Sequence, residues 1–387
     1  MSLMPGGVTL SHDEDLLLQT VREFARAELL PMDRAWDVDE TSVAEVLPRL
    51  AAMGLLSLCL PEALGGLGCS YRLYSAILHE ISSWSASTGV TLSVHNMVAG
   101  MVGHCAREPK RTEWLSHFSE PAHFCAFALS EAGVGSDAAA VRTTATEADG
   151  GFRVSGEKMW ITNGLSARWF LTLVRLNGAP QGQELCALMI DGNEAGITRT
   201  KIRGKMGIRG SETAVIHFNN VLVPQDQRLG EIGEGLDVCR STLNEGRIGI
   251  GVQAAGIAEA CLNEMVSYAR QREQFGQPIG KFQGVADMIA ESAKELEAAK
   301  VLLWNAAGRV DAGAVDRYAS SMAKLYATEA ANRIAYRAVQ IHGGTGYVHE
   351  CRVEQLYRDA RVTTIYEGTS EIQRRVIASG LRKGRFE

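Results

Sequence analysis

The spacing of apolar residues predicts helices in the first third of the chain, residues 1–122. Ser11 and Glu14 have the spacing of a capping box in front of an apolar stripe of helical period, and Pro31 is expected to end that helix. The long stretch 75–106 contains few residues that break helices, so it is expected to be helical too.

The pattern changes over residues 123–236, where short β-branched and aromatic runs such as "RWFLTLVRL" alternate with clusters of Gly, Asn and Asp. Such runs are typical of strands in a small antiparallel sheet or barrel. Over residues 237–387 the helical period returns, with an apolar stripe and opposing charges between residues 285 and 310. The pattern therefore predicts a mostly helical α+β protein with a helical domain, a β-barrel-like domain and a C-terminal four-helix bundle.

Composition and charge exclude several classes of function. The 387 residues are 46% hydrophobic and 22% charged, with a net charge of -6 and no basic stripe for nucleic acid or an anionic membrane. No apolar run reaches the ~18 residues of a membrane span, and the start lacks the pattern of a signal peptide. The eight cysteines are unpatterned, which favours reduced thiols in the cytoplasm, and the histidines lack zinc-site spacing, so no metal is expected.

One glycine motif suggests a nicotinamide site, but its context does not. Residues 249–254, "GIGVQA", match G-x-G-x-x-A, yet the residues before them do not resemble a buried strand. We interpret these glycines as sites of close helix packing.

Two segments of the β region are candidates for ligand contact. In "FALSEAGVGSD", residues 127–137, a strand-like run leads into small residues whose N–H groups can approach a ligand, although a plain hairpin loop fits equally well. In "KMWITNG", a strand would place Trp160 and Thr162 on one side, where Trp160 is either a core residue or a wall against a flat cofactor.

Two further segments are unusual for helical regions. "RQREQFGQP", residues 270–278, and "QIHGGTGY", residues 340–347, each read alone as a helix stop. Glycine N–H groups in the second could meet a pyrophosphate. Together the four segments suggest a large planar cofactor that carries phosphate, bound without a Rossmann domain.

Near the C-terminus, "IYEGTSEIQRR" places Glu367 between apolar residues and a predicted helix start. Ser370 and Gln373 fit a capping box, so a helix should begin at about residue 371. The helix dipole would favour ionised Glu367, whereas burial would raise its pKa. A solvated loop and a catalytic base in an apolar pocket both remain open at this point.

These segments, together with "KMGIRGSET", "LNEGRIGI" and "LYRDARV", resemble the acyl-CoA dehydrogenase family, in family order and over essentially the whole chain. The resemblance implies an FAD enzyme that oxidises an acyl-CoA thioester to its trans-2-enoyl-CoA. Glu367 would remove the α-proton while the β-hydride passes to flavin N5. Its backbone N–H and a ribityl hydroxyl would hold the thioester oxygen, and electrons would pass to an electron-transfer flavoprotein.

The resemblance also assigns binding residues. Those expected to line FAD within one chain are Phe127, Leu129, Ser130, Gly135, Ser136, Trp160, Ile161, Thr162, Thr369 and Glu371. Those expected to hold FAD across a subunit interface are Arg272, Phe275, Phe282, Gln283, Gln340, Gly343 and Gly344. The CoA and substrate contacts would be Ser136, Asn244, Arg247 and Gly368. The shared site implies a homodimer, and family practice a dimer of dimers.

The chain departs from one subgroup of the family, which carries its base on the helix just before the equivalent of Arg247. That position is Gly246 here, and Glu245 should face about 100° away, so it is only a backup candidate. The motifs most resemble the short-chain, butyryl-CoA branch, then the short branched-chain enzymes, which implies fatty-acid β-oxidation or branched-chain amino-acid catabolism. A flavin oxidase and a catalytically silent relative are the alternatives.

Overall fold

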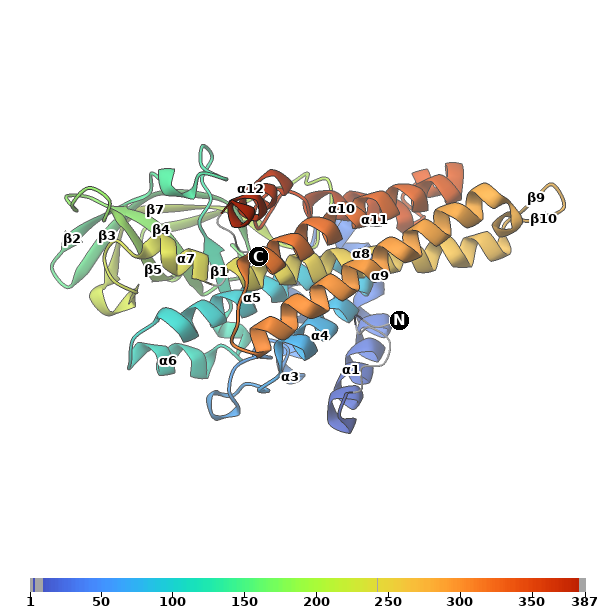
Figure 1. The fold of residues 1–387 in the computed structure, drawn as a ribbon. Helices are drawn as coiled ribbons and strands as arrows, with labels where there is room; N and C mark the ends of the chain where they lie inside the picture. The colour runs from blue at the N-terminus through green and yellow to red at the C-terminus, as the bar shows by residue number, and fades with distance from the viewer. Residues whose placement is uncertain (1–2, 4–9, 242, 383–387) are drawn as a thin grey trace.

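The computed structural model describes residues 3, 10–241 and 243–382, and it has the predicted order of helices, sheet and helices (Figure 1). The α-helices are α1 His12–Phe24, α2 Leu30–Asp39, α3 Leu47–Ala52, α4 Tyr71–Trp84, α5 Ala86–Cys105, α6 Lys110–His117, α7 Gly235–Ser241, α8 Leu243–Gln271, α9 Gln283–Asp311, α10 Arg317–His342, α11 Arg352–Val362 and α12 Ser370–Leu381. The strands are β1 Cys125–Ala128, β2 Thr144–Ala148, β3 Gly151–Thr162, β4 Trp169–Leu176, β5 Leu185–Asp191, β6 Ile197–Lys201, β7 Thr213–Pro224, β8 Arg228–Leu229, β9 Glu273–Gln274 and β10 Gln277–Pro278.

The first helix begins as predicted but does not end at Pro31. The Ser11 and Glu14 side chains form the capping box of α1. After α1 the chain passes through a π-helical turn, Ala25–Leu29, directly into α2. Pro31 lies in the first turn of α2, where proline is tolerated because the N–H groups of a first turn have no partner within the helix.

The sheet is mixed and open, so the expectation of an antiparallel sheet or barrel is only partly right. The strand order is β6-β7-β3-β2-β4-β5-β8, and β1 pairs with β4 off this path. The pairs β1–β4 and β2–β4 are parallel, while the other pairs of this sheet are antiparallel. Strands β2 and β6 give no apolar run in the sequence because most of their residues are polar and partly exposed.

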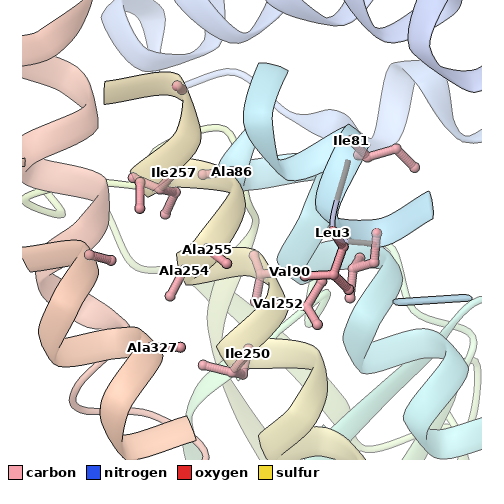
Figure 2. Close-up of a cluster of buried hydrophobic side chains, with 14 of the residues drawn as sticks. Leu3, Ile81, Ala86, Val90, Ile250, Val252, Ala254, Ala255, Ile257 and Ala327 are labelled. Atoms are coloured by element: carbon pink, nitrogen blue, oxygen red, sulfur yellow. The ribbon is translucent and has the colours of Figure 1, made fainter. Parts of the chain in front are cut away.

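Helix α8 is the centre of the helical part. Figure 2 shows its apolar residues lying between α4 and α5 on one side and α10 on the other. A Cβ at Gly249 would lie 2.5 Å from Ser93 Oγ, and one at Gly251 would lie 2.6 Å from Leu303 Cδ2. The glycines of "GIGVQA" therefore permit close helix packing, as predicted, and a Rossmann turn is absent from this segment of α8.

Within the described residues, no helix is long and apolar enough to cross a membrane. All eight cysteines are described, and each is a free thiol.

Candidate active site

The Glu367 loop joins α11 to α12 in an unusual backbone conformation. Glu367 has φ 50° and Gly368 has φ 87°, so two successive residues are left-handed. The helix start differs by one residue from the prediction. Thr369 is the N-cap of α12, because its Oγ1 accepts from the Ile372 N–H, and Ser370 is the first helical residue.

Gln373 does not complete a capping box, and instead braces the loop. Its Nε2 donates to the carbonyl oxygens of Glu367, at 3.1 Å, and Gly368, at 2.9 Å. Gln373 is fully buried, so these bonds do not compete with water. The peptide that carries the Glu367 side chain is therefore fixed from inside the protein.

The Glu367 carboxylate lies in a buried, desolvated position. Although the residue as a whole is partly exposed, its Oε2 is buried and has no hydrogen-bond partner among the described residues. Burial raises the pKa of Glu367, and the positive charges of Arg247 and Lys324 oppose that rise without cancelling it. Such a carboxylate takes up a proton more readily than an exposed glutamate does.

Gly246 of α8 leaves room for this carboxylate. A Cβ at this position would lie 2.9 Å from Glu367 Oε2 and 2.6 Å from Met97 Sδ, which is closer than real Cβ contacts. On the other side, Gly246 and Met97 line a cavity of about 510 Å³ between α4, α5 and α8. The volume is in the range of small-molecule sites. The carboxylate is therefore next to a cavity of suitable size for a substrate.

Glu245, the backup candidate, faces a different neighbour. Its Oε1 lies 3.8 Å from His104 Nε2, and both residues line the same cavity. The interaction with Glu245 raises the pKa of His104.

A buried ion pair holds the loop that follows β1. Lys158 Nζ donates to Glu131 Oε1 at 2.9 Å and to Leu129 O at 3.0 Å. Glu131 also accepts from the Arg142 and Thr143 N–H groups. Burial favours the neutral acid, but these bonds outweigh it and hold the pKa of Glu131 below its ordinary value. The start of the loop is therefore anchored to β3, and Glu131 also ties it to the residues that lead into β2.

This anchored loop and β3 present open surface to a ligand. Across the described residues, a Cβ built at Gly133 or Gly135 would have no heavy atom within 4 Å apart from its chain neighbours. In β3 a bulge precedes Ile161, and Trp160 there has φ 65° and is 57% exposed. Ile161 is buried, whereas Trp160 and Thr162 are not, which confirms the predicted alternation. A large exposed indole beside a glycine loop is suited to stack on a flat ring.

A second hollow, of about 420 Å³, adjoins the start of α12. Thr369 and Glu371 line it, as do Arg333 and Arg361. Glu329 lines it too, so the side-chain charges of the lining balance. The helix N-terminus and the arginine guanidinium groups are nevertheless the kinds of group that bind phosphate. The helix N-terminus and the arginines fit a phosphate group of the predicted cofactor. Of the other residues predicted to line FAD, Leu129, Ser130 and Ser136 belong to the loop after β1, and Phe127 lies in β1 itself.

The remaining predicted cofactor residues lie elsewhere on the chain. Arg272 and Phe275 belong to the β9–β10 hairpin at the tip of α8 and α9, which Figure 1 shows at the opposite end of the molecule from the large sheet. Phe275 is 93% exposed with φ 52°. Gln283, Gln340, Gly343 and Gly344 are exposed, and Phe282 is partly so. One chain therefore presents two separate halves of the predicted FAD site.

Of the predicted CoA contacts, Asn244 and Arg247 lie on one turn of α8. The Asn244 Oδ1 accepts from Arg247 Nη1 at 2.9 Å, and the Arg247 Nε is buried with no partner among the described residues. An unpaired buried donor is costly unless a ligand satisfies it.

Comparison with known proteins places the fold and site in a class. Three family models match in order: the acyl-CoA dehydrogenase N-terminal domain over residues 11–120, the middle domain over 126–221 and the C-terminal domain over 233–382. The short-chain specific acyl-CoA dehydrogenase, mitochondrial, of Rattus norvegicus is 40% identical over 375 residues, which are 97% of this chain and 91% of that protein.

Solved structures agree. Butyryl-CoA dehydrogenase from Megasphaera elsdenii matches with a TM-score of 0.93 at 32% identity, over 97% of this chain and 99% of that one. A chain from a structure of the electron transferring flavoprotein of Acidaminococcus fermentans matches with a TM-score of 0.94 at 33% identity, over 98% and 99%. The chain therefore belongs to the acyl-CoA dehydrogenase family. It is an FAD-dependent acyl-CoA dehydrogenase, as the sequence predicts.

Sequence reasoning missed the residues that hold the site from behind. Lys158, Glu131 and Gln373 are buried. All three occur within the predicted motifs, but the prediction of a ligand site rested on the residues beside them. A buried lysine carries no local pattern that separates it from a solvated one, so only the three-dimensional contacts reveal these roles.

Proposed function

We propose that this chain oxidises a short-chain acyl-CoA, straight or branched, to its trans-2-enoyl-CoA, with Glu367 as the base. The observation that carries the proposal is the Glu367 carboxylate. Its Oε2 is buried and has no partner among the described residues, and it lies close to Gly246, which with Met97 lines the cavity of about 510 Å³. The names of the short-chain and butyryl-CoA relatives support a short acyl chain in the substrate.

The chemistry divides between the protein and its cofactor. Bound FAD supplies the acceptor for the hydride that leaves Cβ. Glu367 takes the proton from Cα and becomes a neutral acid, and the electron pair of that C–H bond forms the Cα=Cβ double bond. The raised pKa of Glu367 suits this transfer.

The thioester oxygen needs donors where negative charge develops. Within the described residues, the N–H groups of Glu367 and Gly368 donate to no protein acceptor. The Glu367 N–H is our candidate for the contact with the thioester oxygen, and Gly368 lies beside the substrate.

We infer that Arg247 and Ser136 contact the CoA arm, and that Asn244 acts mainly by orienting Arg247 through their 2.9 Å hydrogen bond.

Two copies of the chain would complete each FAD site, because the residues at the β9–β10 hairpin and around Gly343 lie far from the anchored loop. A homodimer is then the minimum unit and a dimer of dimers the expected assembly. The electron acceptor would be an electron-transfer flavoprotein.

The test is an anaerobic titration of the holoenzyme with butyryl-, isobutyryl- and octanoyl-CoA, following flavin absorbance. We expect butyryl-CoA to bleach the flavin most rapidly, and Glu367→Gln to keep FAD but abolish bleaching. Glu245→Gln serves as the matched comparison, because that carboxylate lines the same cavity. Bleaching by Glu367→Gln at the wild-type rate would reject the assignment, and rapid reoxidation of the reduced wild-type enzyme by air would instead favour an oxidase.

A further inference from the structure

Lys324 of α10 lies directly behind the Glu367 loop. Its side chain is fully buried, and its Nζ donates to the carbonyl oxygen of Gly368 at 2.9 Å. Lysine is almost never fully buried unless it is paired. In the described part of the chain, no carboxylate oxygen lies within 4.0 Å of this ammonium group, and the Gly368 carbonyl is its hydrogen-bond acceptor. The charge is therefore held at the base without being neutralised by a direct ion pair.

The groups around Glu367 and Lys324 come from three helices. Arg247 of α8 and Lys324 of α10 are the charged groups that act on the Glu367 carboxylate, and both favour its ionised form. Lys324 is influenced by Glu367, by the like charge of Arg247, and by Glu329 and Glu371. Burial lowers the pKa of Lys324 to about 8, so the ammonium group is protonated at neutral pH.

Arg247 and Lys324 are expected to make different contacts once a substrate is bound. The Arg247 Nε has no hydrogen-bond partner in the part of the chain that the structure describes, and we assign Arg247 to the CoA arm under the proposed function. Lys324 is fully buried and bonds to the backbone carbonyl of Gly368, and we assign it no contact with the thioester. Its charge remains directed at the base when ligands exclude water from the site, which is when an uncompensated carboxylate is most costly.

We propose that Lys324 is a positioning residue that keeps Glu367 ionised in the closed site and holds the Gly368 carbonyl beneath it. The inference rests on the proposed function, since it gives Glu367 the role of base. An ionised base is required for proton removal, so flavin reduction should decline as pH falls through the pKa of Glu367. Removal of the Lys324 charge should move that decline to higher pH.

The experiment compares the holoenzyme with Lys324→Met, Lys324→Gln and Lys300→Met. Lys324→Gln keeps a hydrogen-bond donor for the Gly368 carbonyl but removes the charge. Lys300 is the matched control, because it is a buried lysine of the same domain that instead bonds to Glu259. The rate of flavin reduction by saturating butyryl-CoA is measured against pH, below the pKa of about 8 of Lys324.

The acid limb is the part of the pH profile in which the rate of flavin reduction declines at low pH. We expect its midpoint to move to higher pH by about one unit in both Lys324 variants and to stay unchanged in Lys300→Met. A second readout needs no turnover: the change in unfolding free energy caused by Glu367→Gln is measured against pH, both in the wild-type background and in the Lys324→Gln background. The midpoint of its pH dependence should rise with the acid limb.

Acid limbs and midpoints that stay at the wild-type values would overturn the proposal. If no acyl-CoA reduces the wild-type flavin, the proposed function fails, while the unfolding measurement still decides whether Lys324 controls the ionisation of Glu367.

Discussion

At the scale of single residues, the site depends on one position that must be small, Gly246, and one with a left-handed backbone, Glu367. Gly246 leaves space for the Glu367 carboxylate, and Glu367 has a positive φ in the loop that places this carboxylate beside Gly246. The sequence already indicated that Glu367 and Gly246 were special, because their neighbours resemble the family. It could not show that the two are in contact, since they are 121 positions apart.

We predict that Gly246→Ala slows flavin reduction by up to about 100-fold, because its new Cβ displaces the Glu367 carboxylate, and small displacements of a base are costly. Stopped-flow reduction by butyryl-CoA measures the effect. Gly103→Ala is the control, since it lines the same cavity but its Cβ would meet only Leu115, at 3.9 Å. An unchanged rate in Gly246→Ala would show that the carboxylate has room that the structure does not indicate.

At the scale of elements, the junction of α5 with β1 contains a buried neutral histidine. His95 Nδ1 accepts from the Cys125 N–H at 3.1 Å, so its Nε2 donates to Phe118 O at 2.9 Å. The ring stacks on Phe124 with 4.6 Å between centroids. Burial lowers the pKa of His95 from 6.5 to about 4, and a second proton would bring the Nδ1–H against the Cys125 N–H.

This histidine predicts a loss of stability in mild acid. The folded pKa is depressed, so the unfolded chain binds a proton that the folded chain refuses as pH falls from about 6.5 toward 4. The free energy of unfolding should fall across that window by up to roughly 3 kcal/mol from His95. Urea unfolding at a series of pH values measures this, and His95→Gln should reduce the slope. Buried His79, whose pKa is also lowered to about 4, contributes in the same direction in both proteins. An identical slope in His95→Gln would refute this account.

Elements were predictable from the sequence where the local signal agreed with the tertiary structure. Ser11 and Glu14 cap α1 as expected, and the stripe of α9 is buried at Leu296, Ala299 and Leu303. The prediction was wrong at Pro31, where a π turn lets the helical path continue, and the polar strands β2 and β6 gave no apolar run to detect.

At the scale of the whole molecule, the predicted cofactor residues form two sets, one on the large sheet and at the start of α12 and the other around the β9–β10 hairpin and Gly343, with the hairpin at the opposite end of the molecule from the sheet. We predict that Arg272→Ala weakens FAD retention and the dimer together, because the hairpin would reach the FAD site of a second copy. Gel filtration with light scattering and measurement of flavin content test both properties. Arg26→Ala, an exposed arginine of the π turn, should change neither. Full FAD content in a dissociated Arg272→Ala protein would contradict the shared site.

The left-handed backbone at position 367 has a consequence for evolution in the laboratory. A non-glycine residue in this conformation costs on the order of 1 kcal/mol or more, and a buried carboxylate adds to that cost. Glycine would relieve both, so selection for thermal tolerance alone would favour the substitution that removes the proposed base. Engineering of this scaffold for heat resistance must therefore select for turnover at every round, since stability and catalysis make opposite demands on the same residue.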